Sequence, residues 1–458
     1  IIGATFAGAP CILTGANQYL GWTHTVNYPD KADVYELDMV SKNTYLIDGM
    51  EHELVTKKAK VYVHFLGLKI PIKKKYYESI YGPTLKNKTA VFSVRTPSTT
   101  NINALEQWWR MGKARSFSEF YKYLEWNALP GYNIGYADRN DTIFYISNGK
   151  IPRRNPNYDW KLPVAGNTKK TLWNTYYKTQ ELPQVIAPKA GYIYNANHSP
   201  FRSTGTDENP NPDDFAEAMN YERYDNNRST RLFALLNEKD TLSFEDFKRI
   251  KYDRKLPTPL NYNFIDFNAL FDMNPKEYPD VALVLQQIQE WDRVADANSY
   301  GAGAYAVFYY SLGEYYSQLG PSKIVDPPLI YTCLKEAKAY MLKHFGTTEI
   351  RLGDFQKLVR GDKELPIYGL PDVITAMRGK AYKNGRVKIN HGETYIGLIR
   401  FSPDKTTVRS VVPYGSSNHP SSKHFDDQME MYQHFKTKQM SFDRSDVIQG
   451  AKKIYHPQ

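Results

Sequence analysis

The chain has 458 residues, enough for a large hydrophobic core and, by length alone, for two or three domains of about 150 residues. Its 41% of apolar and 24% of charged residues exclude a disordered chain. No apolar run approaches the roughly 18 residues of a membrane span, and two cysteines, Cys11 and Cys333, exclude a disulfide framework. A net charge of +10 over 458 residues is not typical of a nucleic-acid-binding protein unless the charge is clustered. The densest basic run, residues 73–75, reads as a solvated strand face, so we expect no nucleic-acid partner.

The chain begins with IIGATFAGAP, an apolar and glycine-rich opening without the basic region of a signal peptide. Such a beginning is typical of the interior of a longer protein. We therefore expect a fold that is incomplete at its N-terminus.

Residues 1 to about 100 have the patterns of β-strands. Between residues 59 and 72, apolar and polar side chains alternate around a turn near Gly67. From residue 103 to about 126 the period becomes helical, and Ser116 is a candidate N-cap because Glu119 follows three residues later.

Further along, strands are predicted at residues 132–136 and 142–146. Helical patterns dominate from 227 to about 356, and strands return at 393–401 and 407–412. This order of strands, helices, strands, a helical block and strands indicates an α+β core with a helical excursion rather than alternating βα units.

Three short segments carry groups that could bind a developing negative charge. Residues 21–33 read GWTHTVNYPDKAD, residues 191–200 read GYIYNANHSP, and residues 225–231 read DNNRSTR. In an extended segment Asn195 and Asn197 would lie on the same side, because side chains alternate with a period of two. A backbone N–H, an amide and an arginine are groups from which an oxyanion hole can be built. The same residues also suit ordinary turns and a solvated face, so spacing alone leaves both interpretations open.

Other motifs with a known mechanism are missing from the sequence. There is no glycine-rich phosphate loop, no HExxH pair, no CxxC and no GxSxG elbow. The ten histidines are scattered, so a histidine-based metal site is not expected.

The three segments, in this order, resemble the β-subunit of the penicillin acylase family of N-terminal-nucleophile hydrolases. Further matches are WWRMGKARSF at 108–117, NIGYAD at 133–138, KIPRR at 150–154, LPVAG at 162–166, WD at 291–292, VPYGSS at 412–417 and DDQ at 426–428. The THTVN version of the first segment looks more like the acyl-homoserine-lactone and cephalosporin acylase branches. The resemblance covers nearly the whole chain. It implies one domain over residues 1–458 with a four-layer α/β/β/α sandwich, in which residues 230–390 are a largely helical insertion.

The resemblance also implies roles for individual residues. Val26 would give its backbone N–H, and Asn197 its side-chain amide, to the oxyanion. Arg228 would orient Asn197 and stabilise charge near the amine of the nucleophile. Tyr28 and Trp108 would line the acyl pocket, where an aromatic wall buries an apolar chain.

His24 lies in the same segment, and we expect it at the pocket rim or in a structural role rather than in acid–base chemistry. Asp30 and Asp33, with the carbonyl of Ala32, match a calcium-binding loop of some family members. Hard oxygen ligands suit Ca²⁺, while a solvated acidic turn is the alternative. No cofactor is required for the chemistry itself.

The sequence departs from the family at the nucleophile. The family uses the first residue of its β-subunit, usually serine, with its own α-amine as base. Residue 1 here is isoleucine, and no serine of this chain matches that position. We therefore expect a nucleophilic serine outside this chain, an N-terminal part of the β-subunit and an α-subunit as partners. This chain alone is expected to be inactive.

The function implied by the resemblance is amide hydrolysis. The substrate would be a small N-acyl molecule, such as an N-acyl-homoserine lactone or a β-lactam, cleaved through an acyl-enzyme. The alternative is a catalytically silent family member that binds acylated ligands or partners. The resemblance further implies a periplasmic or secreted location.

Overall fold

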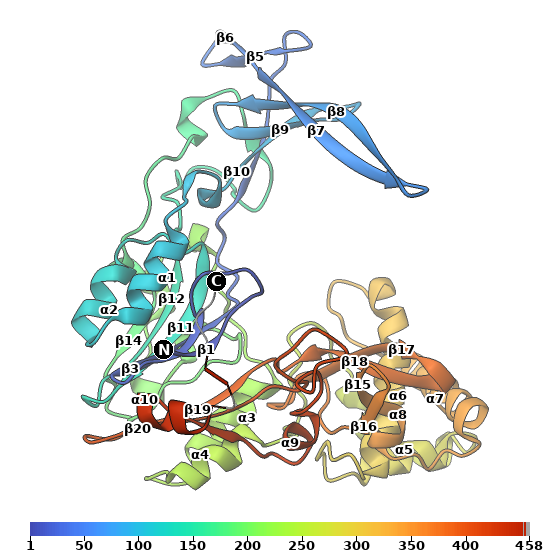
Figure 1. The fold of residues 1–458 in the computed structure, drawn as a ribbon. Coiled ribbons are helices and arrows are strands. Elements are labelled where there is room, and N and C mark those ends of the chain that lie inside the picture. Colours follow the sequence, from blue (N-terminus) through green and yellow to red (C-terminus); the bar gives the residue numbers. More distant parts are fainter. Residues whose placement is uncertain (452, 455–458) are drawn as a thin grey trace.

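A six-stranded antiparallel sheet forms the first central layer of the protein (Figure 1). The computed structural model describes residues 1–451 and 453–454. In sheet order the strands are β1 (Ile2–Ala4), β2 (Thr14–Ala16), β3 (Leu20–Thr25), β11 (Gly131–Asp138), β12 (Ile143–Gly149) and β14 (Gln184–Ile186). Helices α1 (Ala104–Lys113) and α2 (Phe117–Leu124) cover one face of this sheet. There the ring of Phe120 lies 4.8 Å from that of Tyr136 on β11.

The helical segment expected from 103 to 126 is in fact two helices. Ser116 stands between them in an extended conformation, with φ of −150°, which a continuous helix cannot contain. Its Oγ accepts the backbone N–H of Glu119 at 3.3 Å, so the predicted N-cap is confirmed. The helical period and the start of the second helix after Ser116 were thus predicted correctly, but the end of the first helix at Lys113 was not predicted.

A second, three-stranded antiparallel sheet lies against the first. It consists of β19 (Ile396–Phe401), β20 (Thr406–Val411) and β21 (Lys438–Met440). The two sheets meet where Phe401 approaches Gly21 of β3, whose missing side chain leaves room for the ring. On the outer face, α3 (Asn227–Leu236) precedes α4 (Phe244–Lys251), and Phe244 packs against the core of this second sheet. The layers therefore follow the order helix, sheet, sheet, helix, and the fold is α+β.

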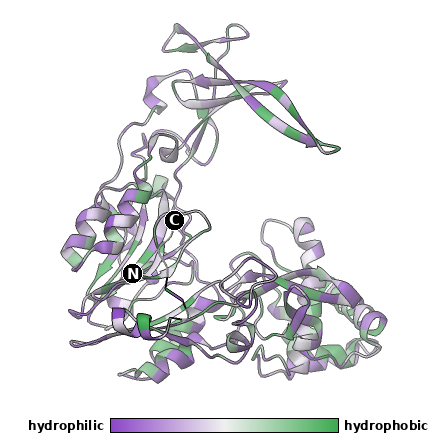
Figure 2. Cartoon of the chain, viewed as in Figure 1, coloured by the Kyte–Doolittle hydropathy of each residue, from purple (hydrophilic) through white to green (hydrophobic). Residues whose placement is uncertain are grey.

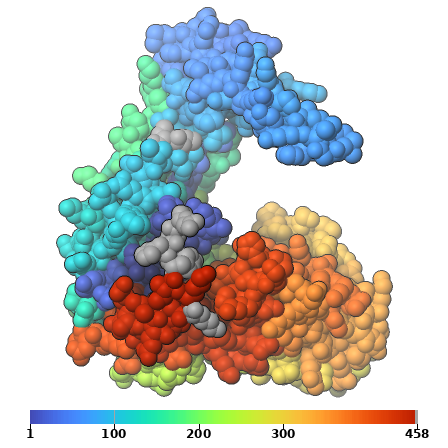
Figure 3. Space-filling model, viewed as in Figure 1, coloured from blue at the N-terminus to red at the C-terminus, as the bar shows by residue number. Residues whose placement is uncertain are grey.

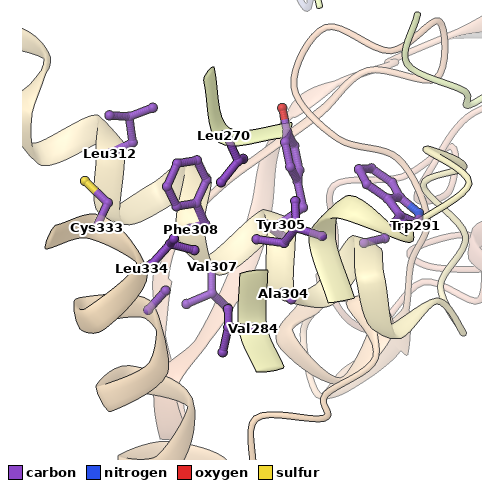
Figure 4. Close-up of a cluster of buried hydrophobic side chains, with 14 of the residues drawn as sticks. Leu270, Val284, Trp291, Ala304, Tyr305, Val307, Phe308, Leu312, Cys333 and Leu334 are labelled. Carbon is purple, nitrogen blue, oxygen red and sulfur yellow. The ribbon is translucent and has the colours of Figure 1, made fainter. Parts of the chain in front are cut away.

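A helical lobe with its own core follows in the chain. Its helices are α5 (Ala282–Gln289), α6 (Tyr300–Tyr315), α7 (Pro327–Phe345) and α8 (Leu352–Phe355). Helix α6 is apolar nearly all round, as a helix in the centre of a lobe should be, and Phe308 is fully buried (Figure 4). Gly303 is required on α6, because a Cβ there would lie 2.1 Å from the carbonyl oxygen of Ile350.

The helical insertion expected over residues 230–390 ends earlier than predicted. Residues 356–392 form a four-stranded sheet with β15 (Gln356–Arg360), β16 (Lys363–Pro366), β17 (Met377–Tyr382) and β18 (Arg386–Gly392). The turn between β17 and β18 contains Asn384 and Gly385, an Asn-Gly pair of the kind that favours hairpins, and both residues have positive φ. Two short helices, α9 (Met429–Gln433) and α10 (Arg444–Gln449), lie near the end of the chain.

A long β-hairpin projects from the body as an arm (Figure 1). Its strands, β7 (Val55–Phe65) and β8 (Leu68–Ser79), are joined by Leu66 and Gly67, both with positive φ, which confirms the predicted turn. The arm is the outer end of a sheet whose other strands, outward to inward, are β9 (Gly82–Lys86), β10 (Val91–Arg95), β4 (Asp33–Glu36) and β13 (Val164–Ala165). A small ribbon of β5 (Thr44–Ile47) and β6 (Met50–Glu53) lies beside its base. Over the described ranges 1–451 and 453–454, no helix combines the length and apolar character needed to cross a bilayer.

Candidate active site

The peptide at Val26 is held by two side-chain amides. Val26 follows directly after β3, and its carbonyl oxygen accepts Nδ2 of Asn197 at 2.8 Å and Nδ2 of Asn133 at 3.0 Å. The structure therefore brings the Val26 backbone and the Asn197 carboxamide together, although 171 residues separate them in the chain. An amide nitrogen carries two N–H groups. Only one N–H of Asn197 is used in a hydrogen bond to the described residues.

The segment that carries Asn197 is bent rather than extended. Asn197 has φ of +57°, a left-handed conformation that asparagine tolerates better than most residues. The side chain of Asn195 does not point the same way as that of Asn197. The Oδ1 of Asn195 accepts the backbone N–H of Asn197 at 3.1 Å and the hydroxyl of Thr25 at 2.6 Å. The expectation that both amides point the same way from an extended segment is wrong, because this backbone turns. Asn195 instead fixes the turn to the end of β3.

Arg228 holds the other end of the Asn197 side chain. Its NH1 donates to Oδ1 of Asn197 at 3.2 Å, and its Nε donates to Oδ1 of Asp372 at 2.9 Å. Asn227 donates both its backbone N–H and its Nδ2 to the second oxygen of Asp372. Burial raises the pKa of Asp372, while Arg228 acts in the opposite direction. The cation fixes which way the Asn197 amide faces, since its oxygen must point toward Arg228.

His24 lies beside the site as a neutral support. Its Nε2 is 3.0 Å from Nε1 of Trp108, and an indole N–H can donate only to an unprotonated ring nitrogen. The rings of Trp108 and Tyr132 lie 5.1 and 5.5 Å from the imidazole. Burial among these groups lowers the pKa of His24 to about 3. Its surroundings thus match a wall residue rather than a base that titrates near neutral pH.

Two cavities border the site, and they separate the expected pocket residues. A cavity of about 1040 Å³ lies between the two central sheets, and His24 and Trp108 contribute to its wall. A second cavity, of about 570 Å³, is lined by Tyr28, Asn197 and Arg228. The prediction that Tyr28 and Trp108 line one pocket is not met. Tyr28 is 58% exposed, and its backbone N–H donates to the carboxylate of the buried Glu222.

The expected calcium loop is organised around an arginine. The buried Arg154 donates from Nε to Oδ2 of Asp33 at 2.9 Å, and its NH2 lies 3.2 Å from Oδ1 of Asp30. Trp173 donates to the same oxygen of Asp33, yet burial raises the pKa of this carboxyl. The other oxygen, Oδ1 of Asp33, is buried and has no hydrogen-bond partner. The backbone N–H of Ala32 donates to Asp30.

The loop offers few oxygen ligands for a cation. Two carboxylates share one guanidinium, and the Lys31 ammonium also acts on Asp30. The unpartnered oxygen of Asp33 could bind an ion. No group of three or more His, Cys, Asp and Glu side chains with metal-site geometry occurs among the residues that the structure describes. A calcium ion here would therefore depend on main-chain carbonyls such as that of Ala32 for its remaining ligands.

Three residues of the site have roles that the sequence did not indicate. Asn133 on β11 lies inside a family-like motif, but no role was assigned to it. Asn195 was noted, but its function in fixing the turn depends on Thr25. Asp372 stands 144 residues after Arg228, and no local pattern indicates their pairing.

Comparisons with known proteins show the family of this chain. The sequence profile of the penicillin amidase family matches residues 1–449. The chain belongs to the penicillin amidase family. The resemblance expected from its motifs is thereby confirmed.

Relatives of this penicillin amidase chain are distant in sequence. It is 22% identical over 490 residues to the acyl-homoserine lactone acylase PvdQ of Pseudomonas fluorescens (strain Pf0-1), covering 94% of this chain and 61% of that protein. It is 26% identical over 203 residues to penicillin G acylase of Escherichia coli, covering 44% of this chain and 24% of that protein. The chain thus spans about three fifths of the acyl-homoserine lactone acylase that it matches.

A comparison with solved structures shows the fold. The structure of a thermostable penicillin G acylase from Alcaligenes faecalis matches with a TM-score of 0.66 and 16% identity, covering all of this chain and 94% of that one. The expected α+β fold of the N-terminal-nucleophile hydrolases is confirmed.

Proposed function

We propose that this penicillin amidase chain is the larger part of an amide hydrolase that removes the acyl group from a small N-acyl molecule. One observation carries the proposal: the Asn197 carboxamide is fixed against the Val26 peptide, with its oxygen held by Arg228 and one N–H left over. A rigid donor of this kind stabilises charge that develops on a carbonyl oxygen, because it does not have to reorient during the reaction.

In the proposed reaction a serine hydroxyl attacks the amide carbonyl and loses its proton to the base. The resulting oxyanion accepts hydrogen bonds from the Val26 N–H and from the second N–H of Asn197. The C–N bond then breaks, the amine leaves with the proton, and water hydrolyses the acyl-enzyme to the acid. None of the residues that line the 570 Å³ cavity is serine, threonine or cysteine. The larger cavity contains Ser410 and Ser416. In the family that this chain resembles, however, the nucleophile is the first residue of the β-subunit, so we propose that it comes from a segment outside these 458 residues.

The two cavities suit the two halves of such a substrate. The larger cavity has Trp108 and Tyr132 in its wall and can bury an apolar acyl chain. The smaller one contains Arg378 and His391 as well as Tyr28, which suits a polar amine. The names of the relatives suggest N-acyl-homoserine lactones and β-lactams as first substrates to test. By family resemblance we propose a periplasmic or secreted location, which cell fractionation would test.

Turnover of the complete enzyme, expressed from its whole coding region, tests this function. Release of acid from N-acyl-homoserine lactones of different chain length and from β-lactams is measured by mass spectrometry. Asn197→Ala is expected to lower kcat by about 10²–10³ with little change in KM. Asn197→Gly should do the same, and it removes the strain that alanine suffers at positive φ.

Asn140→Ala is the matched control, since this amide is exposed in the turn between β11 and β12. Wild-type turnover in both Asn197 variants would refute the assignment. No turnover of any acyl amide by the complete wild-type enzyme would support the catalytically silent alternative instead.

We also propose a structural calcium ion at Asp30, Ala32 and Asp33, supported by the unpartnered oxygen of Asp33. The ion would stabilise the loop and take no part in the chemistry. Millimolar calcium is expected to raise Tm relative to EDTA, magnesium to raise it less, and Asp30→Asn to remove the increment. An unchanged Tm would show that Arg154 and Lys31 balance the two carboxylates by themselves.

A further inference from the structure

The β7–β8 arm has two chemically different faces. The cross-strand pairs Val61 with Ile72, Val63 with Ile70, and Phe65 with Leu68 place six apolar side chains on one side, here called the apolar face. The opposite side, here called the lysine face, carries Lys58, Lys60, Lys69, Lys73 and Lys75. Figure 2 shows apolar residues in the outer half of the arm.

The apolar face is open to solvent. Its six side chains are between 39% and 66% exposed, and Leu66 at the tip is 86% exposed. A two-stranded hairpin alone is marginally stable in water, so a contiguous apolar surface on it indicates a partner that covers it. In Figure 3 the arm extends over a hollow that separates it from the lower body, so this body does not cover it.

The positive charge of the arm indicates that the partner presents acidic side chains to it. Residues 55–79 contain seven lysines and one glutamate, so this one hairpin contributes +6 to a net charge of +10. Its single ion pair among the described residues joins Lys57 to Glu78. Lys60 and Lys69 lie over the ring of Tyr62 rather than beside a carboxylate. A partner with carboxylates opposite the lysine face would complement this charge.

The backbone of the arm favours a polypeptide over a lipid surface. Strand β7 is the last strand of its sheet, so its outer edge presents unpaired N–H and C=O groups. Such groups are costly in hydrocarbon, where nothing can satisfy them, but another polypeptide can pair with them. The acyl-homoserine lactone acylase of Pseudomonas fluorescens also has about two fifths of its length without a counterpart in this chain, since the match covers 61% of it.

We propose that the β7–β8 arm is the docking surface for the polypeptide that completes this acylase. The partner covers the apolar face with its own apolar side chains and places acidic side chains against the lysine face. The inference rests on the proposed function only in the identity of the partner, as the chain or segment that supplies the rest of the enzyme.

Hydrogen exchange of residues 55–79 provides the first test. It is compared between this chain alone and the complete enzyme expressed from its whole coding region. The arm is expected to exchange at least tenfold more slowly in the complete enzyme. Turnover is measured on the same preparation, which keeps the two proposals separate. An active enzyme with an unprotected arm overturns the docking surface alone, whereas a protected arm without activity overturns only the hydrolase.

Two negative charges introduced on the apolar face provide the second test. The double variant Val63→Asp/Ile70→Asp is expected to reduce co-purification of the partner segments at least tenfold. Because both side chains are exposed, the fold of this chain should be unchanged by circular dichroism. Leu283→Asp, at a 70% exposed position on α5, is the matched control and should assemble normally. Assembly of the double variant at the wild-type level would overturn the proposal.

Lysine-to-glutamine changes at Lys58, Lys60, Lys73 and Lys75 should make assembly weaker and less sensitive to salt. Two other outcomes would also overturn the proposal. One is co-sedimentation of the complete enzyme with phosphatidylglycerol vesicles that is lost in the Val63→Asp/Ile70→Asp variant. The other is sedimentation showing that the same variant abolishes a dimer of two copies of this chain.

Discussion

Arg228 illustrates how one residue of the site depends on another that is far away in the sequence. It touches the Asn197 oxygen with one nitrogen and the Asp372 carboxylate with another. Hydrogen bonds to charged groups contribute about 1.5–3 kcal/mol, and a rate changes tenfold for each 1.36 kcal/mol. The orientation of the amide therefore depends on Asp372 as a positioning residue.

Asp372→Asn is expected to lower kcat of the complete enzyme by roughly 10- to 100-fold, with a smaller change in KM. In an Arg228→Gln background, Asp372→Asn should lower kcat only slightly further, because its effect passes through the arginine. Steady-state kinetics of the four proteins provide the double-mutant cycle. Independent, additive losses would show that Asp372 acts on something other than Arg228.

His24 connects the site to the stability of the protein at acid pH. Its pKa is about 3 in the folded chain, against about 6.5 for an ordinary histidine. Between these two values the unfolded chain binds more protons than the folded one. The free energy of unfolding should therefore fall as pH drops through this window. Above pH 6.5 the lowered pKa of His24 should not affect the free energy of unfolding.

His24→Gln keeps an acceptor for the Trp108 N–H but cannot be protonated. Between pH 7 and pH 4 this variant is expected to lose less stability than the wild type, measured as the urea midpoint at each pH. His419→Gln, at an exposed position, is the control and should follow the wild type. Parallel curves for His24→Gln and wild type would contradict the buried, neutral imidazole.

At the scale of elements, helix α2 depends on its cap. The Ser116 hydroxyl satisfies one of the backbone N–H groups that a helix start leaves open. Ser116→Ala should lower the free energy of unfolding by about 1 kcal/mol, measured by urea titration. Ser118→Ala, at an exposed position inside the same helix, should cause no loss because alanine is the better helix former. Equal effects of the two changes would show that the cap is not important.

At the scale of the whole molecule, the sandwich and the helical lobe have separate apolar cores. Phe120 belongs to the core between α1, α2 and the first sheet, whereas Phe308 belongs to the core of the lobe. Two cores without shared residues can open independently, each with its own free energy.

Phe308→Ala is expected to destabilise the lobe by about 3–5 kcal/mol. Hydrogen exchange should accelerate in α5, α6 and α7 while α1, α2 and β11 keep their protection. Phe120→Ala should give the reverse pattern. Equal acceleration in both parts would show that the two cores unfold as one unit.

The sequence by itself determined the local features of this protein. Alternation predicted the arm and its turn at Gly67, helical spacing predicted α1 and α2, and the Ser116 cap followed from two residues three positions apart. The ordered motifs also indicated the family, because each is a short segment that can be read without knowing its neighbours in space.

Only the tertiary structure decided how the site is built. It paired Asn197 with Val26 and Arg228 with Asp372, bent the segment around Asn195, and placed Tyr28 and Trp108 in different cavities. Contacts between residues more than a hundred positions apart come from the packing of sheets and helices. Local periodicity contains no information about which of many amides and carboxylates that packing brings together.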